Sequence, residues 1–227
     1  MNPLEEKVEV SLRLLRQLLR EHGVDQVAVA WTGGKDSTVA LDLWRRVLAH
    51  AGKESAAGSA RALTLDTGLK FPEVVSFRNR LARDWKIDLV VARPRMDIAH
   101  YPVAEDKLDC CAKLKVEPLQ RAVRGMKVTA LVTGLRRDEH ESRAGRDYLE
   151  KREEPDYVQC NPLLDWTEMD IWAYTTGRGL PFCELYSKGY RSLGCVPCTE
   201  TAEGTERSGR DADKEGKLDT LRSLGYF

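Results

Sequence analysis

The feature that most constrains the fold of this chain is a short apolar run that leads into a two-glycine loop and then a helix. The run is Gln26–Trp31, the loop holds Gly33 and Gly34, and Ser37–His50 carries apolar residues at helical spacing. Glycines let the backbone approach an anion closely, and the start of a helix offers free N–H groups and a positive dipole end. The pattern predicts a buried strand that ends in an anion-binding turn.

The remaining sequence alternates between apolar runs and helical repeats. Strands that alternate with helices form βαβ units, so we expect an α/β fold with a doubly wound, mostly parallel sheet and helices on both faces. We expect further strands at 60–65, 87–91 and 128–133, and helices at 4–21, 72–85 and 114–124. We divide the chain into an N-terminal helix (1–24), a nucleotide-binding α/β domain with the cysteines (25–200) and a C-terminal tail (201–227).

Two later stretches carry signals of their own. Residues 135–156 are strongly charged and indicate a surface segment or a mobile flap. Thr167 is placed as a helix N-cap, with Asp170 three residues on completing a near capping box. Beyond Cys198 the chain is polar as far as Leu218.

Composition narrows the class of protein. The 36 basic and 36 acidic side chains cancel, so we expect neither general nucleic-acid binding nor attraction to a membrane surface. No stretch reaches the roughly 18 apolar residues that cross a bilayer, and the N-terminus does not resemble a secretory signal. We therefore expect a cytoplasmic protein, in which the six cysteines are reduced and serve as ligands or nucleophiles rather than disulfides.

The glycine loop has the composition of a phosphate site. Lys35 supplies a point charge, while Ser37 and Thr38 supply hydroxyl donors. The glycines are not spaced as in a Walker loop. The alternative is a simple turn in which Asp36 or Ser37 caps the helix. The candidate phosphate-binding residues are Thr32, Gly33, Gly34, Lys35, Asp36, Ser37 and Thr38.

Four cysteines form a second candidate site. Cys110 and Cys111 are adjacent, and Cys195 and Cys198 form a C-x-x-C pair. Neighbouring side chains diverge and rarely converge on one tetrahedral zinc ion, whereas an iron–sulfur cluster offers each thiolate its own iron. Zinc, or structural or redox-active thiols, stay as alternatives. Cys160 and Cys183 fit no ligand spacing and are expected to be ordinary buried thiols.

Charged residues also gather where strands are predicted to end. Arg136, Arg137 and Arg143 follow the fourth strand and its Gly134, and Asp66 ends the second strand. Open parallel sheets bind ligands at this edge, and arginine suits phosphate or sulfate oxygens. A solvated charged loop for the arginines, and a helix cap for Asp66, are the alternatives.

These motifs together resemble a known family. The loop is similar to the Ser-Gly-Gly-Lys-Asp-Ser signature of the N-type ATP pyrophosphatases, with threonine in place of the first serine. The cysteines and their neighbours resemble the [4Fe-4S] adenylyl-sulfate reductases. Residues 25–227 as a whole resemble the phosphoadenylyl-sulfate (PAPS) reductase family, which includes the small subunit of ATP sulfurylase. Four stretches look closer to that subunit: 66–71, 136–143, 161–172 and 225–227.

The resemblance implies an activity on adenine nucleotides in sulfur metabolism. It implies ATP with Mg²⁺ at the loop, split at the α-phosphate for transfer to sulfate or another oxyanion acceptor, and a [4Fe-4S] cluster on the four cysteines. Catalytic roles fall on Lys35, Asp66, Arg136, Arg137 and Arg143, and nucleotide binding extends to Gly134. A partner subunit or a homo-oligomer fits this resemblance.

Two other functions stay open at this point. One is a sulfonucleotide reductase with a non-standard nucleophile. Reductases of this family use a cysteine in a C-terminal Glu-Cys-Gly motif, and no cysteine follows Cys198 in this sequence. The other is a non-catalytic nucleotide or redox sensor.

Overall fold

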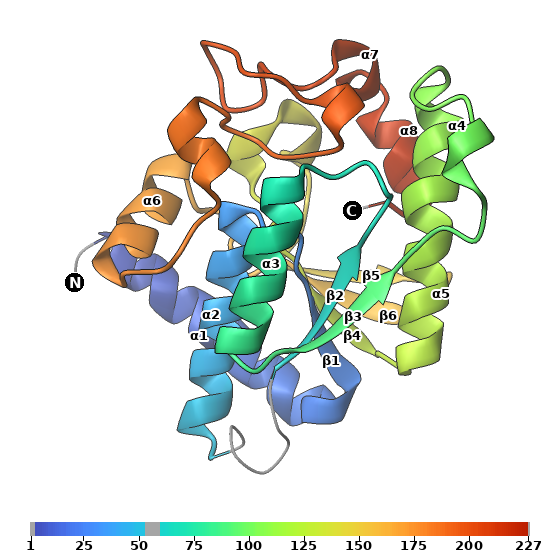
Figure 1. The fold of residues 1–227 in the computed structure, drawn as a ribbon. Helices are drawn as coiled ribbons and strands as arrows, with labels where there is room; N and C mark the ends of the chain where they lie inside the picture. Colours follow the sequence, from blue (N-terminus) through green and yellow to red (C-terminus); the bar gives the residue numbers. More distant parts are fainter. Residues whose placement is uncertain (1–2, 53–59, 227) are drawn as a thin grey trace.

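One six-stranded sheet organises the molecule, which was analysed as a computed structural model that describes residues 3–52 and 60–226 (Figure 1). The strand order is β3-β2-β1-β4-β6-β5, and every neighbouring pair is parallel except β5 with β6. The strands are β1 (Val27–Ala30), β2 (Arg61–Leu65), β3 (Asp88–Ala92), β4 (Ala130–Val132), β5 (Leu149–Arg152) and β6 (Tyr157–Cys160). The expected mostly parallel α/β sheet is confirmed.

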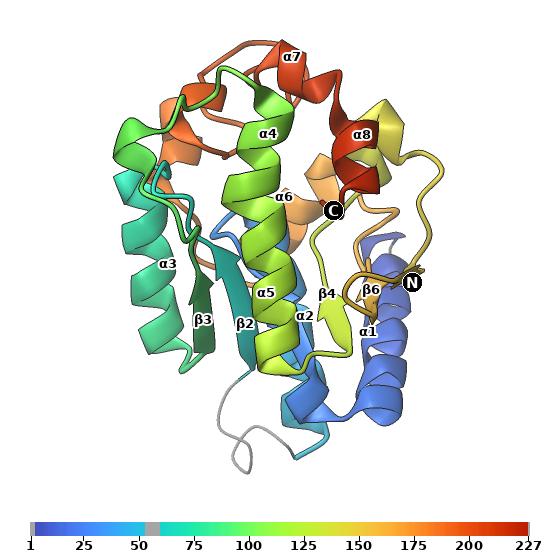
Figure 2. The same cartoon turned by 90° about the vertical axis from the view of Figure 1, so that its right-hand side faces the viewer.

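Helices cover both faces of this sheet, as Figures 1 and 2 show. Those on one face are α1 (Pro3–His22), α2 (Lys35–His50), α3 (Pro72–Asp84) and α6 (Glu168–Gly177). The other face packs against α5 (Glu117–Met126), which continues α4 (Lys107–Cys111) through a π-helical turn, Ala112–Val116. Two short helices, α7 (Ala212–Glu215) and α8 (Leu218–Ser223), complete the set.

The central strand explains why two cores form. Val27, Val29 and Trp31 point into the core beneath α1, α2 and α3, whereas Ala28 and Ala30 point toward α5. Successive side chains of a strand alternate between the two faces of a sheet, and a parallel strand covered by helices is apolar on both. The continuous apolar run at 26–31 is the sequence signature of this arrangement.

Several expectations hold to within a few residues. The leader helix is α1, and α2 starts at Lys35, immediately after the glycine loop. The capping box is confirmed: the Thr167 hydroxyl accepts from the Asp170 N–H, and the Asp170 carboxylate accepts from the Thr167 N–H. None of the described helices is both long and apolar enough to cross a membrane.

The prediction for residues 135–156 was wrong in part. Arg136 is fully buried and Arg146 nearly so, and residues 149–152 form the edge strand β5. Both arginines are held by carboxylates, Arg136 by Asp36 and Arg146 by Glu150. The charges in this stretch therefore mark internal ion pairs as well as a surface.

The chain after α6 returns to the start of α2. In Figures 1 and 2 the orange and red segments lie across one end of the sheet, beside α4. The backbone of Lys70, just after β2, forms an isolated antiparallel bridge with that of Cys195. The Glu206 carboxylate forms an ion pair with Lys35. The segment from 190 to 226 thus covers the end of the sheet where the predicted phosphate loop, residues 32–38, lies.

Candidate functional site

The loop after β1 is organised by its own hydroxyl groups. The Thr32 hydroxyl accepts from the Gly34 N–H at 3.3 Å and lies 3.2 Å from the Ser37 hydroxyl. The Thr38 hydroxyl donates to the Gly34 carbonyl at 2.8 Å and accepts from the Trp31 indole N–H at 3.1 Å. The predicted phosphate-binding residues therefore form one hydrogen-bonded turn.

Two glycines are required for this turn to fit. Gly33 has a φ of +82°, a conformation that side chains disfavour. A Cβ on Gly134, at the end of β4, would lie 2.7 Å from the backbone nitrogen of Ser37. Gly134 thus lets the end of β4 approach the first turn of α2.

A cavity of about 150 Å³ opens beside this turn. Its walls come from four parts of the chain: the loop, the end of β4, the turns after β4 and the C-terminal segment. The lining residues include Thr32, Gly34, Lys35, Asp36, Ser37, Gly134, Glu139, Arg143, Tyr186, Ser192, Arg207, Arg210 and Tyr226. The position matches the expected nucleotide edge of the sheet.

Lys35 lies at this cavity but its ammonium group is turned into the protein. Its Nζ donates to the Arg191 carbonyl at 3.1 Å, forms an ion pair with Asp36 at 3.3 Å and donates to the Glu206 carboxylate. Burial works to lower the pKa of Lys35, but the negative charge around it, that of Asp36 first, outweighs this and raises the pKa. Lys35 is a permanent cation.

Arg136 joins the same ion-pair network from the end of β4. It is fully buried, and its three donor nitrogens contact Asp36 at 2.6 Å, Asp138 at 3.1 Å and Glu206 at 2.5 Å. Burial opposes the charge, yet the carboxylates of Asp36, Glu139 and Glu206 outweigh it and raise the pKa of Arg136. Glu206 therefore bridges the two cations that the loop and β4 contribute.

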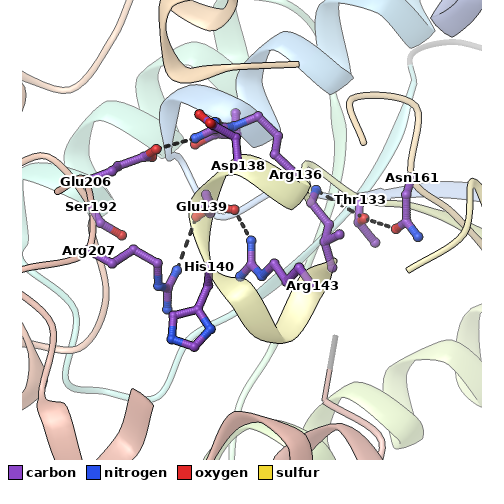
Figure 3. A network of polar contacts seen from close by, with 12 residues as sticks. Thr133, Arg136, Asp138, Glu139, His140, Arg143, Asn161, Ser192, Glu206 and Arg207 are labelled. Atoms are coloured by element: carbon purple, nitrogen blue, oxygen red, sulfur yellow. Dashed lines mark hydrogen bonds and ion pairs between the residues drawn. The ribbon is translucent and has the colours of Figure 1, made fainter. Parts of the chain in front are cut away.

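A second network lies next to the first (Figure 3). The figure shows Glu139 between Arg143 and Arg207, with Glu206 directed toward Arg136. Arg207 also binds both carboxylate oxygens of Glu215, at 2.6 and 2.9 Å. Burial raises the pKa of Glu139, but Arg143 and Arg207 outweigh it and bring the pKa down to about 2.

Three carboxylates of these networks come close together. One oxygen each from Asp36, Glu139 and Glu206 lies within 4.8 Å of the others. Each is already paired with a lysine or an arginine. As they stand, the three act as counter-ions to the basic residues.

Two of the predicted catalytic residues, Asp66 and Arg137, lie apart from both the cavity and the ion-pair networks beside it. Arg137 pairs with Asp165 and donates to the Arg146 carbonyl at 2.7 Å. Asp66 accepts from the Gly68 N–H at 3.2 Å and pairs with Arg93 at 3.3 Å. The structure thus brings Lys35, Arg136 and Arg143 together and leaves these two apart from them.

The four predicted ligand cysteines are all buried, on two segments. Cys110 and Cys111 end α4, where the helix passes into its π-helical turn. The Cys195–Cys198 turn is held beside the end of β2, because the Val196 N–H donates to the Leu69 carbonyl at 2.8 Å. Burial, followed by the charges of Cys111 and Cys195, raises the pKa of Cys110, so these three thiols share one environment.

Two lysines influence these thiols, the buried Lys115 and the half-buried Lys70. Burial raises the pKa of Cys195, but the ammonium groups of Lys115 and Lys70 outweigh it and lower the pKa to about 6. The Thr67 hydroxyl adds a contact of 3.4 Å to its Sγ. No three of the four thiols lie within 4.8 Å of one another. A zinc ion with Zn–S bonds of about 2.3 Å would hold its sulfurs roughly 3.8 Å apart.

The other two cysteines behave as expected. Cys160 is fully buried on β6, and burial raises its pKa to about 12. Cys183 is fully buried as well, and burial raises its pKa. Both are inert core thiols.

Sequence reasoning missed several residues of the site. Glu206, Arg207 and Arg210 fall in the stretch expected to be a polar tail, and two of them, Arg207 and Arg210, line the cavity. Tyr186 accepts from the Lys35 N–H at 2.9 Å and had no signal in the sequence.

Comparisons with known proteins agree with this architecture. Adenosine 5'-phosphosulfate reductase from Geobacillus kaustophilus is 31% identical, over 96% of this chain and 91% of its own length. Adenosine 5'-phosphosulfate reductase 1 from Bacillus subtilis is 33% identical, over 92% of this chain and 88% of its own length.

Solved structures share the fold. Phosphoadenylyl-sulfate reductase from Candida auris, in a phosphate complex, has a TM-score of 0.69 at 22% identity, covering 84% of this chain and 90% of its own. FMN adenylyltransferase from Candida glabrata, in complex with FAD and inorganic pyrophosphate, has a TM-score of 0.67 at 17% identity, covering 99% and 85%. At these identities the likeness extends to the fold alone.

A family model described as the phosphoadenosine phosphosulfate reductase domain matches residues 26–201, which hold the loop, the arginines and all four clustered cysteines. With most of the chain matched in this way, and relatives more than 30% identical over nearly their whole length, the chain belongs to the phosphoadenosine phosphosulfate reductase family.

Proposed function

We propose that this protein is a sulfonucleotide reductase that takes adenylyl sulfate or its 3'-phosphorylated form and releases sulfite. The observation that carries the proposal is the combination, in one domain, of a phosphate loop and four buried thiols in the Cys-Cys and Cys-x-x-Cys pattern. Relatives named adenosine 5'-phosphosulfate reductase, 31% and 33% identical, support it. This reverses the order expected from sequence alone, where ATP splitting came first.

The reaction needs two thiols. One thiolate attacks the sulfur of the nucleotide, the S–O bond to the phosphate breaks, and the nucleoside monophosphate leaves with its electron pair. A second thiol then attacks the resulting S-sulfonate, so that sulfite departs and the two thiols become a disulfide. Arginines at the cavity, Arg143 and Arg210, would bind the sulfate or phosphate oxygens.

We assign the nucleophilic thiol to a co-reactant rather than to one of the six cysteines of this sequence. All six cysteines are buried, and four of them are committed to the proposed cluster. A low-molecular-weight dithiol or a dithiol protein would supply both sulfurs. This is the non-standard nucleophile that the sequence left open.

The donor set fits a [4Fe-4S] cluster on Cys110, Cys111, Cys195 and Cys198. Four buried thiols on two segments, two of them adjacent in sequence, are the kind of donor set that binds a polynuclear group, in which each thiolate takes its own iron. When bound, the cluster would bring its four thiolates and their charge to the end of β2. Lys70 and Lys115 are placed to balance that charge.

The test compares products. Purified protein is incubated anaerobically with adenylyl sulfate, with its 3'-phosphorylated form, or with ATP and Mg²⁺ plus sulfate, each with and without dithiothreitol. We expect sulfite and nucleoside monophosphate only from the sulfonucleotides and only with the dithiol. Pyrophosphate from ATP without any sulfite from the sulfonucleotides would refute the proposal.

A second candidate is ATP-dependent adenylyl transfer, and the intact Gly33-Gly34-Lys35 loop favours it. In that reaction an oxyanion such as sulfate attacks the α-phosphorus of ATP bound with Mg²⁺, and pyrophosphate leaves. The loop would hold the departing pyrophosphate, with Lys35 and Arg136 as its cations. The same product assay separates the two candidates.

A further inference from the structure

The main cation of the proposed phosphate loop, Lys35, is already bound by acceptors of the protein itself. The Lys35 ammonium group has three N–H donors, and three acceptors surround it: the Arg191 carbonyl, Asp36 and Glu206. Its side chain is 1% exposed. No donor of Lys35 is therefore left over for a ligand phosphate in this arrangement.

The second cation, Arg136, is also paired with carboxylates, through three of its five N–H donors. Arg136 directs its three donor nitrogens at Asp36, Asp138 and Glu206 and is completely buried. Glu206 is the one carboxylate of these contacts that arrives from the C-terminal segment, and it is 8% exposed. Its two carboxylate oxygens go to different cations, Oε1 to Lys35 and Oε2 to Arg136.

The backbone around Glu206 is held in place. The backbones of Thr199 and Arg210 form an antiparallel bridge, and the Glu200 N–H donates to the Gly209 carbonyl at 2.8 Å. Residues 199–210 therefore form a closed loop. Next to Glu206, Arg207 is fastened by Glu215 and Glu139. The carboxylate of Glu206 is thus a tethered anion at the position where a loop of this type would hold terminal phosphates.

We infer that Glu206 determines which nucleotides this site accepts, by occupying the cation pair that a β,γ-pyrophosphate would need. The inference rests on the proposed binding of an adenine nucleotide at this loop, and it names the class of nucleotide. The site prefers a nucleotide without a terminal pyrophosphate, such as AMP or adenylyl sulfate, over ATP. This role of Glu206 also explains how a loop of the ATP-binding type can occur in one domain with the cysteines of a sulfonucleotide reductase.

The experiment is calorimetric titration of the wild type and of Glu206→Gln with AMP, ATP and inorganic pyrophosphate at one Mg²⁺ concentration. Glutamine keeps the size and an acceptor but removes the charge. Contacts between a charged donor and a phosphate change affinity by about ten- to a hundredfold. We expect Glu206→Gln to bind ATP and pyrophosphate at least tenfold more tightly than the wild type, with AMP changed less than threefold.

Glu203→Gln is the matched control, because Glu203 lies on the same loop and is exposed. It should leave all three affinities unchanged. Since the lost charge leaves two buried cations, thermal unfolding is measured in parallel, and pyrophosphate should raise the melting temperature of Glu206→Gln more than that of the wild type. Equal effects of the ligands on both proteins would overturn the inference.

If the variant does not fold, the affinities of the wild type for ATP and AMP still test the inference. Wild-type protein that binds ATP more than tenfold more tightly than AMP would contradict a blocking role for Glu206. These outcomes are distinct from failure of the proposed function. Absence of sulfite from adenylyl sulfate would refute the reductase, whereas the ATP-to-AMP ratio tests only the role of Glu206.

Discussion

At the scale of single residues, the site depends on positions where only one type of residue fits. Gly134 is such a place, because an added Cβ would meet the backbone of Asp36 and Ser37 at 2.7–2.8 Å. The neighbours are backbone atoms and cannot turn aside. The start of α2 and the segment that follows β4 therefore approach so closely that only glycine fits at position 134.

We predict that Gly134→Ala lowers the free energy of unfolding by about 1–3 kcal/mol, as overpacking does, and weakens nucleotide binding. Urea unfolding and nucleotide titration measure the two effects. Gly125→Ala is the control: Gly125 lies within α5, and its added Cβ would meet nothing within 4 Å. That variant should be neutral or slightly stabilising, since alanine favours helices. A Gly134→Ala protein as stable as the wild type would disprove the close approach.

Glu139 gives a prediction about pH. Arg143 and Arg207 lower its pKa from 4.5 to about 2, so its charged form stabilises the fold above pH 4.5 and this contribution is lost as the pH falls toward 2. The shift corresponds to a stabilisation on the order of 3 kcal/mol. We expect the difference in unfolding free energy between wild type and Glu139→Gln to be largest at pH 6–7 and to shrink by pH 3. A difference independent of pH would show that Glu139 is not held as a carboxylate.

The residues of the site differ in how well they could be predicted from the sequence. The turn from Thr32 to Thr38 is local, so its glycines and hydroxyls were visible in the order of the chain. The burial of Arg136 depends on Glu206, which is 70 positions away, and no local pattern records such a pairing. Long-range ion pairs of this kind make a charged residue look like a surface residue until the fold is known.

At the scale of elements, local rules worked where an element carries its own signal. The α6 N-terminus has a complete capping box, and β1 is apolar throughout. In contrast, β5 has the sequence Leu-Glu-Lys-Arg and becomes a strand only because β6 pairs with it. The edge strand of a sheet has little apolar burial to encode, so its sequence resembles a charged loop.

We predict that Thr167→Ala destabilises the protein by about 1 kcal/mol, because the first turn of α6 loses its cap. Thr167→Ser keeps the hydroxyl and should be close to the wild type. Chemical denaturation of the three proteins measures this. If serine and alanine cost the same, the hydroxyl is not the stabilising group.

At the scale of the whole molecule, the two candidate sites are joined by one stretch of chain. Cys195 and Cys198 stand at its start, and Glu206 follows within the loop closed by Thr199 and Arg210. The sheet determines where both sites lie, since the cysteine turn is fastened after β2 and the phosphate loop follows β1. This arrangement follows from topology, which the alternating strands and helices predicted.

Metal content tests the cysteine site. We predict that anaerobically purified protein is brown and holds close to four iron atoms per chain, as a [4Fe-4S] cluster requires. Cys195→Ser and Cys198→Ser should lose most of the iron and the visible absorbance. Cys160→Ser and Cys183→Ser are the matched controls, because both thiols are buried and neither belongs to the proposed ligand set, and they should keep it. Stoichiometric zinc without iron would contradict the assignment.

The antiparallel strand β5 has a consequence for how copies of this protein meet one another. A sheet whose outermost strand presents unpaired N–H and C=O groups is a template for joining another chain edge to edge. Here that strand is only four residues long, and Lys151 on it is exposed and charged, while Glu150 and Arg152 are half-buried. An approaching copy would have to bury the Lys151 charge to extend the sheet. The sheet is thereby protected against intermolecular β-pairing and aggregation at this edge, even at the high concentrations reached during expression.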